Sequence, residues 1–397
     1  MDILNHLTEK FTQSFHAEPS FITRAPGRVN LLGEHVDYND GWVLPAAIDR
    51  AAYVAVGECP SPLVSLTAAD LDDGTTFRVT DLDSKIDVIG KPLKSWARYP
   101  AGVAWALKER GLAVNGMDAV LTSDVPRGAG LSSSAAVEVA FAVAWQRLGG
   151  WSLPPMDVAR TCQRAENQYV GVNSGLMDQF ASACGRAGHA LLLDCRTLAW
   201  EPVSLPDGIA IVVADTLVRR ELGKSAYNVR RAQCEEAVRI LAPVLPGVTA
   251  LRDVSVDDFN RHAHLLPEVV AKRARHVVEE CARTRAAVEI LRAGHAEEFG
   301  ALMNDCHASL RDLYEVSCPE LDAMVEAAQK IEGCYGARLT GAGFGGCTVN
   351  LVAASASADF KHALAAAYEK ATGEKAEIYV CQSTDGARVI WDADTRG

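Results

Sequence analysis

A stretch near the start of the chain, GRVNLLGEHVDYNDGW at residues 27–42, concentrates side chains that can do chemistry. It places the cation Arg28 close to the hydrogen-bonding side chains Glu34, His35 and Asp37, after a short apolar run. Charges this dense form a solvated turn, a metal site, or a pocket that grips a polar ligand. A metal site lacks support because His35 is the only histidine there. Carboxylates are strong acceptors for ligand hydroxyls, so the pattern favours the pocket.

A second stretch, VPRGAGLSSSAAVEVAFAVAW at residues 125–145, has the composition of an anion cradle. Glycines let a backbone approach a ligand closely, and the helix predicted after the three serines begins with unpaired N–H groups. The stretch is not a Walker loop, because no lysine follows the glycines in the required position. A capped core helix with a flexible start remains the alternative.

A third stretch, LTGAGFGGCTVNLV at residues 339–352, satisfies the G-x-G-x-x-G pattern of dinucleotide-binding proteins. In those proteins the glycines follow a strand and open a helix. Here they run into CTVNLV, which is a strand pattern. We therefore expect a tight glycine loop between two strands, shaped for the close approach of another backbone or of a ligand.

Composition limits the class of protein. The chain has 397 residues, which predicts two lobes, and its net charge of −12 argues against a partner with nucleic acid. Its eleven cysteines include no C-x-x-C pair, which fits reduced thiols in a cytoplasmic protein. The N-terminal residues read as an amphipathic helix capped by Asp2, not as a signal peptide. No run approaches the ~18–20 apolar residues of a membrane span.

Strand and helix patterns are interleaved without strict alternation, so the expected fold class is α+β with two lobes. Turn residues put the boundary near 186–207, which gives an N-terminal lobe at 1–200 and a C-terminal lobe at 201–397. The expected helices are 96–110, 132–149, 156–171, 225–243, 268–292, 295–312, 318–331 and 357–371. The expected strands are TRAPGRVNLLG, YVAVGE, DAVLTSDVP, HALLLDC, GIAIVVAD and CTVNLVAA.

Taken in order, the three stretches resemble the motifs of the GHMP small-molecule kinases, and G-R-x-N-L-x-G-E-H-x-D-Y resembles the galactokinase signature in particular. Further matches lie across most of the chain: KSWARY (94–99), RAENQYVG (164–171), NSGLMDQF (173–180) and SAYNVRRAQCEEA (225–237). Two departures stand out. Leu32 occupies a position where isoleucine is usual, and the segment from about 243 to 270 matches no part of the family pattern, so its role stays open.

The resemblance implies a GHMP kinase fold with the active site in the cleft between lobes. It also implies ATP-dependent phosphorylation of D-galactose on the anomeric hydroxyl, the first step of galactose metabolism, with ATP and Mg²⁺ as cofactors. The implied sugar contacts are Glu34, His35, Val36, Asp37, Gly175 and Tyr227. The implied phosphate-binding loop is Gly128, Ala129, Gly130, Leu131, Ser132, Ser133 and Ser134.

The same resemblance implies catalytic roles for Asp178 and Arg28 and magnesium ligation by Ser134 and Glu166. An aspartate with an ordinary pKa is a weak base toward a sugar hydroxyl, so whether Asp178 takes the proton or only orients the hydroxyl is left open. Trp96 matches a residue near the adenine, and a core tryptophan is the alternative. Glu166 could equally be an exposed helical acid.

Two rival functions remain at this stage. A kinase for a related sugar such as N-acetylgalactosamine would keep the chemistry and enlarge the pocket. A non-catalytic sugar and ATP sensor would keep the fold, but it has no need of the intact serine run and the pair of Arg28 and Asp178. We expect a monomer that takes a small-molecule substrate and binds neither nucleic acid nor membrane.

Overall fold

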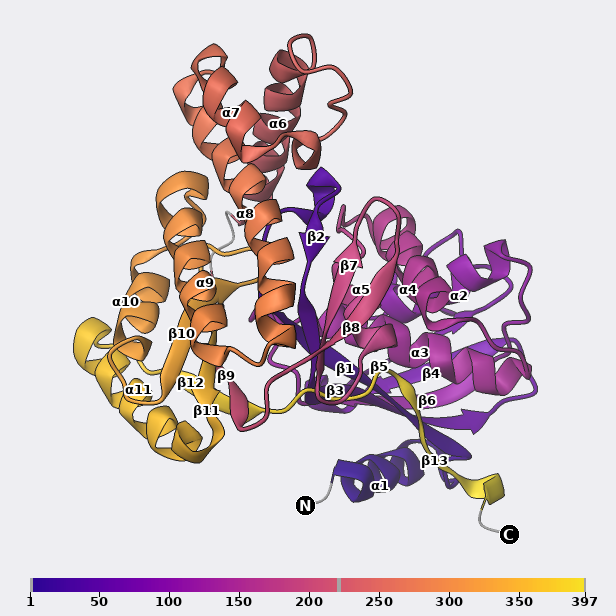
Figure 1. Cartoon of the computed structure of the whole chain (residues 1–397). Coiled ribbons are helices and arrows are strands. Elements are labelled where there is room, and N and C mark those ends of the chain that lie inside the picture. Colours follow the sequence, from indigo (N-terminus) through magenta and orange to yellow (C-terminus); the bar gives the residue numbers. More distant parts are fainter. Residues whose placement is uncertain (1–2, 220–222, 396–397) are drawn as a thin grey trace.

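The structure is a computed structural model that describes residues 3–219 and 223–395. It forms two lobes that lie side by side, with a helical tip above them (Figure 1). Apolar side chains of both lobes belong to one continuous core, in which Leu31 and Leu339 are both fully buried. The α+β fold with two lobes that the sequence predicts is confirmed.

The N-terminal lobe is built on a six-stranded sheet whose order is β13-β1-β3-β6-β4-β5. Its strands are β1 (Phe21–Asn30), β3 (Pro45–Glu58), β4 (Leu63–Ala68), β5 (Asp73–Arg78), β6 (Met117–Ser123) and β13 (Arg388–Asp392). The β4–β6 pair is parallel and the other pairs are antiparallel. Because β13 comes from the end of the chain, the last strand returns to the first lobe. The division at residue 200 stays a prediction, with this strand as its exception.

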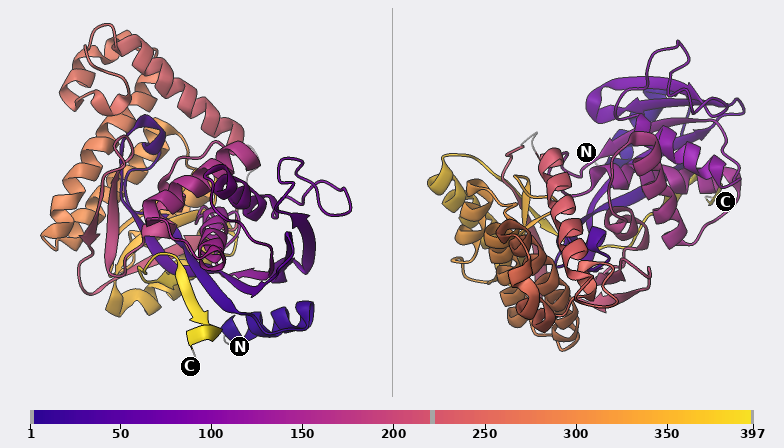
Figure 2. Two further views of the ribbon diagram at one scale, coloured as in Figure 1. Left: turned by 90° about the vertical axis from the view of Figure 1, so that its right-hand side faces the viewer. Right: turned by 90° about the horizontal axis from the view of Figure 1, so that it is seen from above.

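Helices cover both faces of that sheet. On the inner face, α3 (Ser133–Gly149) and α5 (Met177–Cys184) pack on β1 and β3, and α2 (Arg98–Glu109) and α4 (Pro155–Arg164) pack on these two helices. The outer face carries α1 (Ile3–Phe15). Leu7 and Phe11 of α1 are buried against Ile22, Ala55 and neighbouring sheet residues. The expected N-terminal helix is thus present, and its proposed cap, Asp2, lies outside the described residues. Both ends of the described chain lie on this lobe (Figure 2).

The C-terminal lobe contains a four-stranded antiparallel sheet of order β10-β11-β9-β12. Its strands are β9 (Ile209–Asp215), β10 (Cys334–Thr340), β11 (Cys347–Ala353) and β12 (Glu377–Cys381), and α9 (Ala296–Ser309), α10 (Pro319–Ala328) and α11 (Ser357–Thr372) pack on it. Successive side chains of β9 separate by face, as strand geometry requires. Val212 and Ala214 join the cluster under α10 and α11, whereas Ile211 and Val213 join the main core.

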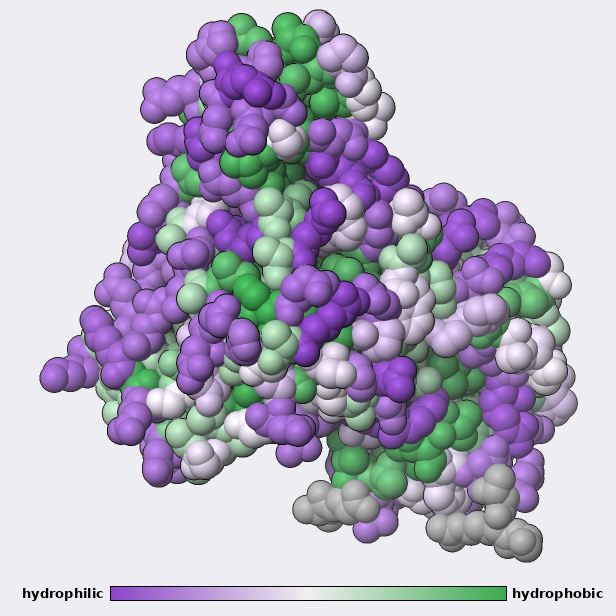
Figure 3. Space-filling view, in the orientation of Figure 1, coloured by the Kyte–Doolittle hydropathy of each residue, from purple (hydrophilic) through white to green (hydrophobic). Residues whose placement is uncertain are grey.

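The helical tip is formed by α6 (Gly223–Leu241), the short helical turn Leu251–Asp253, α7 (Val256–His262) and the upper part of α8 (Glu268–Arg292). Polar residues cover most of the face seen in Figure 3, and apolar residues gather at its top over α6 and α7. A third sheet of β2 (Trp42–Val43), β7 (His189–Asp194) and β8 (Trp200–Ser204) lies between the tip and the N-terminal lobe.

Two helices expected to be continuous change their winding. The helix predicted over 156–171 is α4 followed by a π-helical turn at Ala165–Val170, and the one predicted over 295–312 ends in a π-helical turn at Leu310–Tyr314. Neither α5 nor α7 is predicted from periodicity, because eight-residue and seven-residue helices present too few turns to establish it. The expected glycine loop between two strands is present between β10 and β11.

Candidate active site

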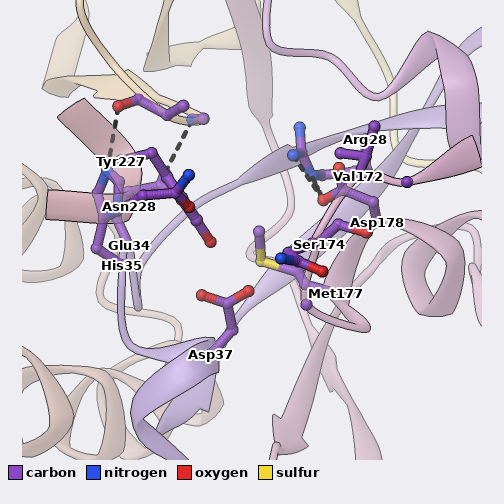
Figure 4. A pocket seen from close by; sticks show the side chains of 15 residues that line it. Arg28, Glu34, His35, Asp37, Val172, Ser174, Met177, Asp178, Tyr227 and Asn228 are labelled. Atoms are coloured by element: carbon purple, nitrogen blue, oxygen red, sulfur yellow. Dashed lines mark hydrogen bonds and ion pairs between the residues drawn. The ribbon is translucent and has the colours of Figure 1, made fainter. Parts of the chain in front are cut away.

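A cavity of about 350 Å³ opens between the lobes and collects side chains from distant parts of the sequence. The signature after β1, the segment before α5, the start of α6 and the glycine loop after β10 all contribute to it. Its lining residues are Arg28, Glu34, His35, Asp37, Gly171, Val172, Asn173, Ser174, Gly175, Met177, Asp178, Tyr227, Asn228, Gly341 and Ala342. Figure 4 shows Asp37 and Asp178 on facing walls.

Arg28 and Asp178 form the ion pair at one end of this cavity. Arg28 donates from Nε at 2.9 Å and from Nη2 at 2.6 Å to the same oxygen, Oδ1 of Asp178. Its third nitrogen, Nη1, donates to the carbonyl of Gly130 at 2.5 Å. The Arg28 side chain is 5% exposed and that of Asp178 is 28% exposed. The carboxylate is therefore accessible from the cavity, with the more deeply buried cation behind it.

Asp37 lies on the opposite wall, in the short helical turn Asp37–Asn39. Burial, followed by the negative charges of Asp178 and Glu34, raises the pKa of its carboxyl from 3.8 to about 6. Gly175 makes room for this carboxylate, because a Cβ at that position would lie 1.9 Å from Asp37 Oδ2. The observed position of the Asp37 carboxylate therefore requires glycine at position 175.

Glu34 and His35 are in the cavity wall, where protein groups already bond to one carboxylate oxygen of Glu34 and to both ring nitrogens of His35. Glu34 Oε2 accepts from buried Arg338 and from the N–H of Gly341, the latter at 3.0 Å. Burial raises the pKa of Glu34, with Arg338 opposing the effect. His35 Nε2 lies 3.2 Å from the carbonyl of Ala342 and Nδ1 lies 3.0 Å from the hydroxyl of Tyr38, and burial lowers its pKa to about 3. His35 is thus neutral and uses both ring nitrogens within the protein.

Two further predicted sugar contacts differ in position. Val36 is fully buried in the core and is absent from the cavity lining, and its carbonyl accepts from the N–H groups of Asn39 and Gly41. Tyr227, near the start of α6, does line the cavity, with its ring 5.6 Å from that of His35 and 5.2 Å from that of Tyr38.

The second glycine stretch forms a cradle at the start of α3. Gly128 and Gly130 adopt φ values of 68° and 81°, which glycine reaches without strain. Ser132 precedes the helix at φ 62°, and its Oγ is buried with no hydrogen-bond partner among the described residues. A buried hydroxyl without a partner costs free energy, so this atom is available to hydrogen-bond a polar ligand. The unpaired N–H groups in the first turn of α3 lie at the same end of the helix as the positive pole of its dipole, which favours an anion there.

The two glycine loops pack against each other. A Cβ on Gly130 would lie 3.2 Å from the carbonyl of Thr340, and a Cβ on Gly346 would lie 3.0 Å from the carbonyl of Ala129. Between them opens a crevice of about 320 Å³, lined by both loops and by Arg219. Arg219 donates to both carboxylate oxygens of Asp215 at 2.8 and 2.6 Å and was not predicted from the sequence.

Ser134 and Glu166 come together behind the cradle. Ser134 Oγ donates to Glu166 Oε1 at 3.2 Å, and Gln179 Nε2 donates to Glu166 Oε2 at 2.8 Å. Glu166 is 5% exposed, so it is not the exposed helical acid that the sequence also allowed. Burial raises its pKa, while hydrogen bonds such as that from Ser174 act in the other direction. The π-helical turn at 165–170 carries this carboxyl.

A separate cavity of about 360 Å³ borders the serine run on its outer side. Trp96 and Tyr99 line it together with Leu71, Ser133 and Ser134. Trp96 donates from Nε1 to Asp73 Oδ2 at 3.0 Å, which fixes the indole at the edge of this cavity. The tryptophan is thus half-buried at a pocket wall, and a flat aromatic surface there suits a planar ring.

A buried polar network under Glu34 was not anticipated. Arg338, fully buried on β10, holds Glu34 and donates to the carbonyl of Leu31 at 3.1 Å. Glu280 of α8 accepts from the N–H of Gly33 at 2.7 Å, and His276 Nε2 lies 3.1 Å from the carbonyl of Glu34. His276 and Glu280 are four residues apart on a face rich in valine and cysteine, and polar residues at helical spacing on an apolar face were the available signal.

Among the described residues, no group of three or more His, Cys, Asp or Glu side chains could hold a metal ion. In the same part of the chain, no helix is long and apolar enough to cross a membrane.

The fold, the paired glycine loops and the cavity between lobes define a GHMP small-molecule kinase. Family models agree: the GHMP kinases N terminal domain matches residues 98–186, the GHMP kinases C terminal matches residues 287–370, and the galactokinase galactose-binding signature matches residues 9–58. The chain belongs to the galactokinase family.

Similar proteins cover almost the whole chain. The galactokinase of Roseiflexus sp. (strain RS-1) is 50% identical over 386 residues, 97% of each chain, and that of Chloroflexus aggregans is 45% identical over 98% of this chain and 99% of its own. The structure of Lactococcus lactis galactokinase complexed with galactose has a TM-score of 0.90 at 36% identity, covering 97% of this chain and 99% of the other. The mevalonate kinase of Methanococcus jannaschii, 17% identical, has a TM-score of 0.64, covers 92% and 99%, and shows the fold alone.

Proposed function

We propose that this member of the galactokinase family uses ATP to phosphorylate D-galactose on its anomeric hydroxyl, giving galactose 1-phosphate. The observation that carries the proposal is the position of the Arg28–Asp178 pair. It lines the cavity between the lobes and is bonded through Arg28 to Gly130 of the phosphate cradle. A sugar hydroxyl in the cavity and a phosphate on the cradle would both reach the same pair.

Asp37 is the main sugar acceptor in this proposal. Its carboxyl faces the cavity and is costly to ionise there, so donation from ring hydroxyls would stabilise the charged form. The hydroxyl of Tyr227 and the backbone at Gly175 complete the set of contacts. Glu34 can offer its Oε1 to the sugar, because Arg338 and Gly341 both bond to Oε2. His35 and Val36 act by shaping the wall and the turn.

The cradle fits the triphosphate of ATP. The unpartnered Oγ of Ser132, the glycine backbone and the free N–H groups of α3 together supply donors for phosphate oxygens. Arg219 adds a cation at the opening of the crevice. The cavity that Trp96 and Tyr99 line takes the adenine.

Ser134 and Glu166 fit Mg²⁺, which prefers oxygen ligands and is usually held by one or two protein groups together with substrate phosphates. When bound, the ion would neutralise charge on the transferring phosphoryl group. The buried Glu166 carboxyl, whose pKa is raised by burial, would gain a counter-charge.

Asp178 orients the anomeric hydroxyl with the oxygen that Arg28 leaves free, because both guanidinium donors go to Oδ1. In a loose transition state the hydroxyl loses its proton late, so orientation matters more than basicity. Arg28 pairs with Asp178 and stabilises negative charge on the moving group.

The test is ATP consumption across galactose, glucose and N-acetylgalactosamine, with the phosphorylated position read by NMR. Losing one charge-assisted hydrogen bond to the axial hydroxyl should cost roughly 2–4 kcal/mol, so galactose should exceed glucose by about 30- to 1,000-fold in kcat/KM. Preference for N-acetylgalactosamine would reassign the sugar. No turnover with any of them, despite galactose binding, would indicate a sensor.

A further inference from the structure

The turn that carries Asp37 is clamped from outside by residues of the segment that matches no part of the family pattern. In the short helical turn Leu251–Asp253, the side chain of Arg252 is 9% exposed. Arg252 Nη1 donates to the backbone carbonyl of Asp40 at 2.6 Å. An almost buried guanidinium is therefore bonded directly to the backbone three residues after Asp37.

Two other contacts fix the orientation of that guanidinium. It forms a bidentate pair with Asp194 at the end of β7, at 2.6 and 3.0 Å. Its Cζ also lies 3.7 Å from the centre of the Trp42 ring, and Trp42 pairs with Asp194 in the small sheet. Bidentate pairing and stacking on an aromatic face are properties of arginine that lysine lacks.

A second arginine closes the clamp from the other side. Arg196, just after β7, donates to both carboxylate oxygens of Asp253 at 2.6 and 2.9 Å and to Asp40 Oδ2 at 3.0 Å. Asp40 is thus held through its backbone by Arg252 and through its side chain by Arg196. Residues of the N-terminal lobe and of the helical tip meet at this one position.

The turn itself is too tight to absorb a displacement of Asp40. The carbonyl of Val36 accepts from the N–H of Asn39 at 3.0 Å and from that of Gly41 at 2.8 Å. Asp40 adopts φ 60°, and a Cβ on Gly41 would lie 2.7 Å from that of Val36. A movement of Asp40 therefore moves the whole turn, including Asp37.

We infer that Arg252 is a positioning residue for galactose binding, which holds the Asp37 turn in place by clamping Asp40, Asp194 and Trp42 together. The inference rests on the proposed role of Asp37 as a sugar acceptor. It gives the segment at 243–270 a function: the helical tip braces the sugar side of the site and makes no contact with the phosphate cradle through Arg252.

The experiment compares Arg252→Ala and Arg252→Lys with the parent chain by steady-state kinetics and by calorimetric titration of galactose. Misplacing one sugar acceptor should raise the galactose KM and Kd on the order of 10- to 100-fold in Arg252→Ala, with the ATP KM changing by less than about twofold. Arg252→Lys should be intermediate, because it keeps the charge and loses the bidentate geometry and the stacking. If Arg252 only stabilised the fold, Arg252→Ala would raise both KM values or lower kcat alone. Either result would overturn the inference.

Arg292→Ala is the matched control. Like Arg252, Arg292 forms an ion pair with the small sheet, from the end of α8 to Glu201 at 2.8 Å. Unlike Arg252, it is exposed and does not contact the turn that carries Asp37. It should leave both KM values unchanged. If Arg252→Ala fails to fold, Arg196→Ala and Asp253→Asn, which loosen the same clamp from its exposed side, carry the test with a smaller rise in the galactose KM.

Asp37→Asn distinguishes a failure of the role inferred for Arg252 from a failure of the proposed sugar site. Weak galactose binding by Asp37→Asn together with normal binding by all the clamp variants would overturn the inference and leave the proposed site intact. Normal galactose binding by Asp37→Asn would overturn the proposed site itself.

Discussion

Asp37→Asn should make the protein more stable and its galactose binding weaker, and the gain in stability should depend on pH. The substitution replaces a carboxyl in the cavity by a neutral group of the same shape. Burial and the neighbouring charges of Asp178 and Glu34 raise the pKa of Asp37 from 3.8 to about 6. The folded state therefore disfavours the ionised form relative to the unfolded chain.

The magnitude follows from that shift. At pH 8, about two pKa units correspond to about 3 kcal/mol of destabilisation by the ionised Asp37, an upper value that water in the cavity reduces. At pH 4.5 most of the folded molecules carry the proton, and the same calculation gives about 1 kcal/mol. A raised pKa in an acid means that stability is fully present below the unfolded pKa and is lost as the pH rises through about 6.

Thermal unfolding of the two proteins at pH 8 and pH 4.5 measures this difference. With an unfolding entropy of about 2.1 cal/mol/K per residue, the full effect at pH 8 amounts to a rise of roughly 4 °C in Tm for Asp37→Asn. The rise should shrink to roughly 1 °C at pH 4.5. A Tm increase of equal size at both pH values, or a Tm decrease at pH 8, would refute the electrostatic reasoning.

Other predictions concern the groups around Asp37. Arg28→Ala and Asp178→Asn should each remove most of the turnover, and the double variant should be little worse than the poorer single one, with a coupling on the order of 1–3 kcal/mol in kcat/KM; simple additivity would contradict the pair. Gly175→Ala places a Cβ 1.9 Å from Asp37 Oδ2 and should raise the galactose KM about 10- to 100-fold at constant ATP KM. Glu166→Ala should raise the Mg²⁺ concentration for half-maximal rate, with galactose affinity measured without nucleotide unchanged; an unaltered magnesium titration would remove Glu166 from the metal site.

The resemblance to the family motifs was sufficient to predict many of the residues that line the cavity. Arg28, Asp37 and Tyr227 are all at the cavity, because short motifs fix the local backbone and the family order fixes how the motifs meet. Spacing could not say that both ring nitrogens of His35 have protein partners. Tyr38 is only three residues away, but the contact with the carbonyl of Ala342 depends on packing between residues more than 300 positions apart.

The buried supports of the site were the other part that the sequence left open. Arg338 has no short-range signature, because its partners are Glu34 and the carbonyl of Leu31, in a turn far away in the chain. The spacing of Glu280 from His276 marks polar residues on an apolar helix face, but it does not reveal that Glu280 accepts from the N–H of Gly33. The same holds for Arg252, whose charge looks like that of any surface arginine until Asp194 and Trp42 are placed beside it. Short elements such as α5 and β13 were missed for a related reason: tertiary pairing, more than local pattern, sets their conformation.

The return of β13 to the first sheet has a consequence for how the chain is synthesised and handled. Until residues 388–392 are available, β1 has a partner only on its β3 side, and its other edge exposes unpaired backbone N–H and C=O groups. Open edges of this kind template pairing between chains. A fragment cut after residue 200, or a chain on the ribosome that still lacks residues 388–392, should therefore be prone to aggregation, and the sheet of the N-terminal lobe becomes complete only once those residues have been made.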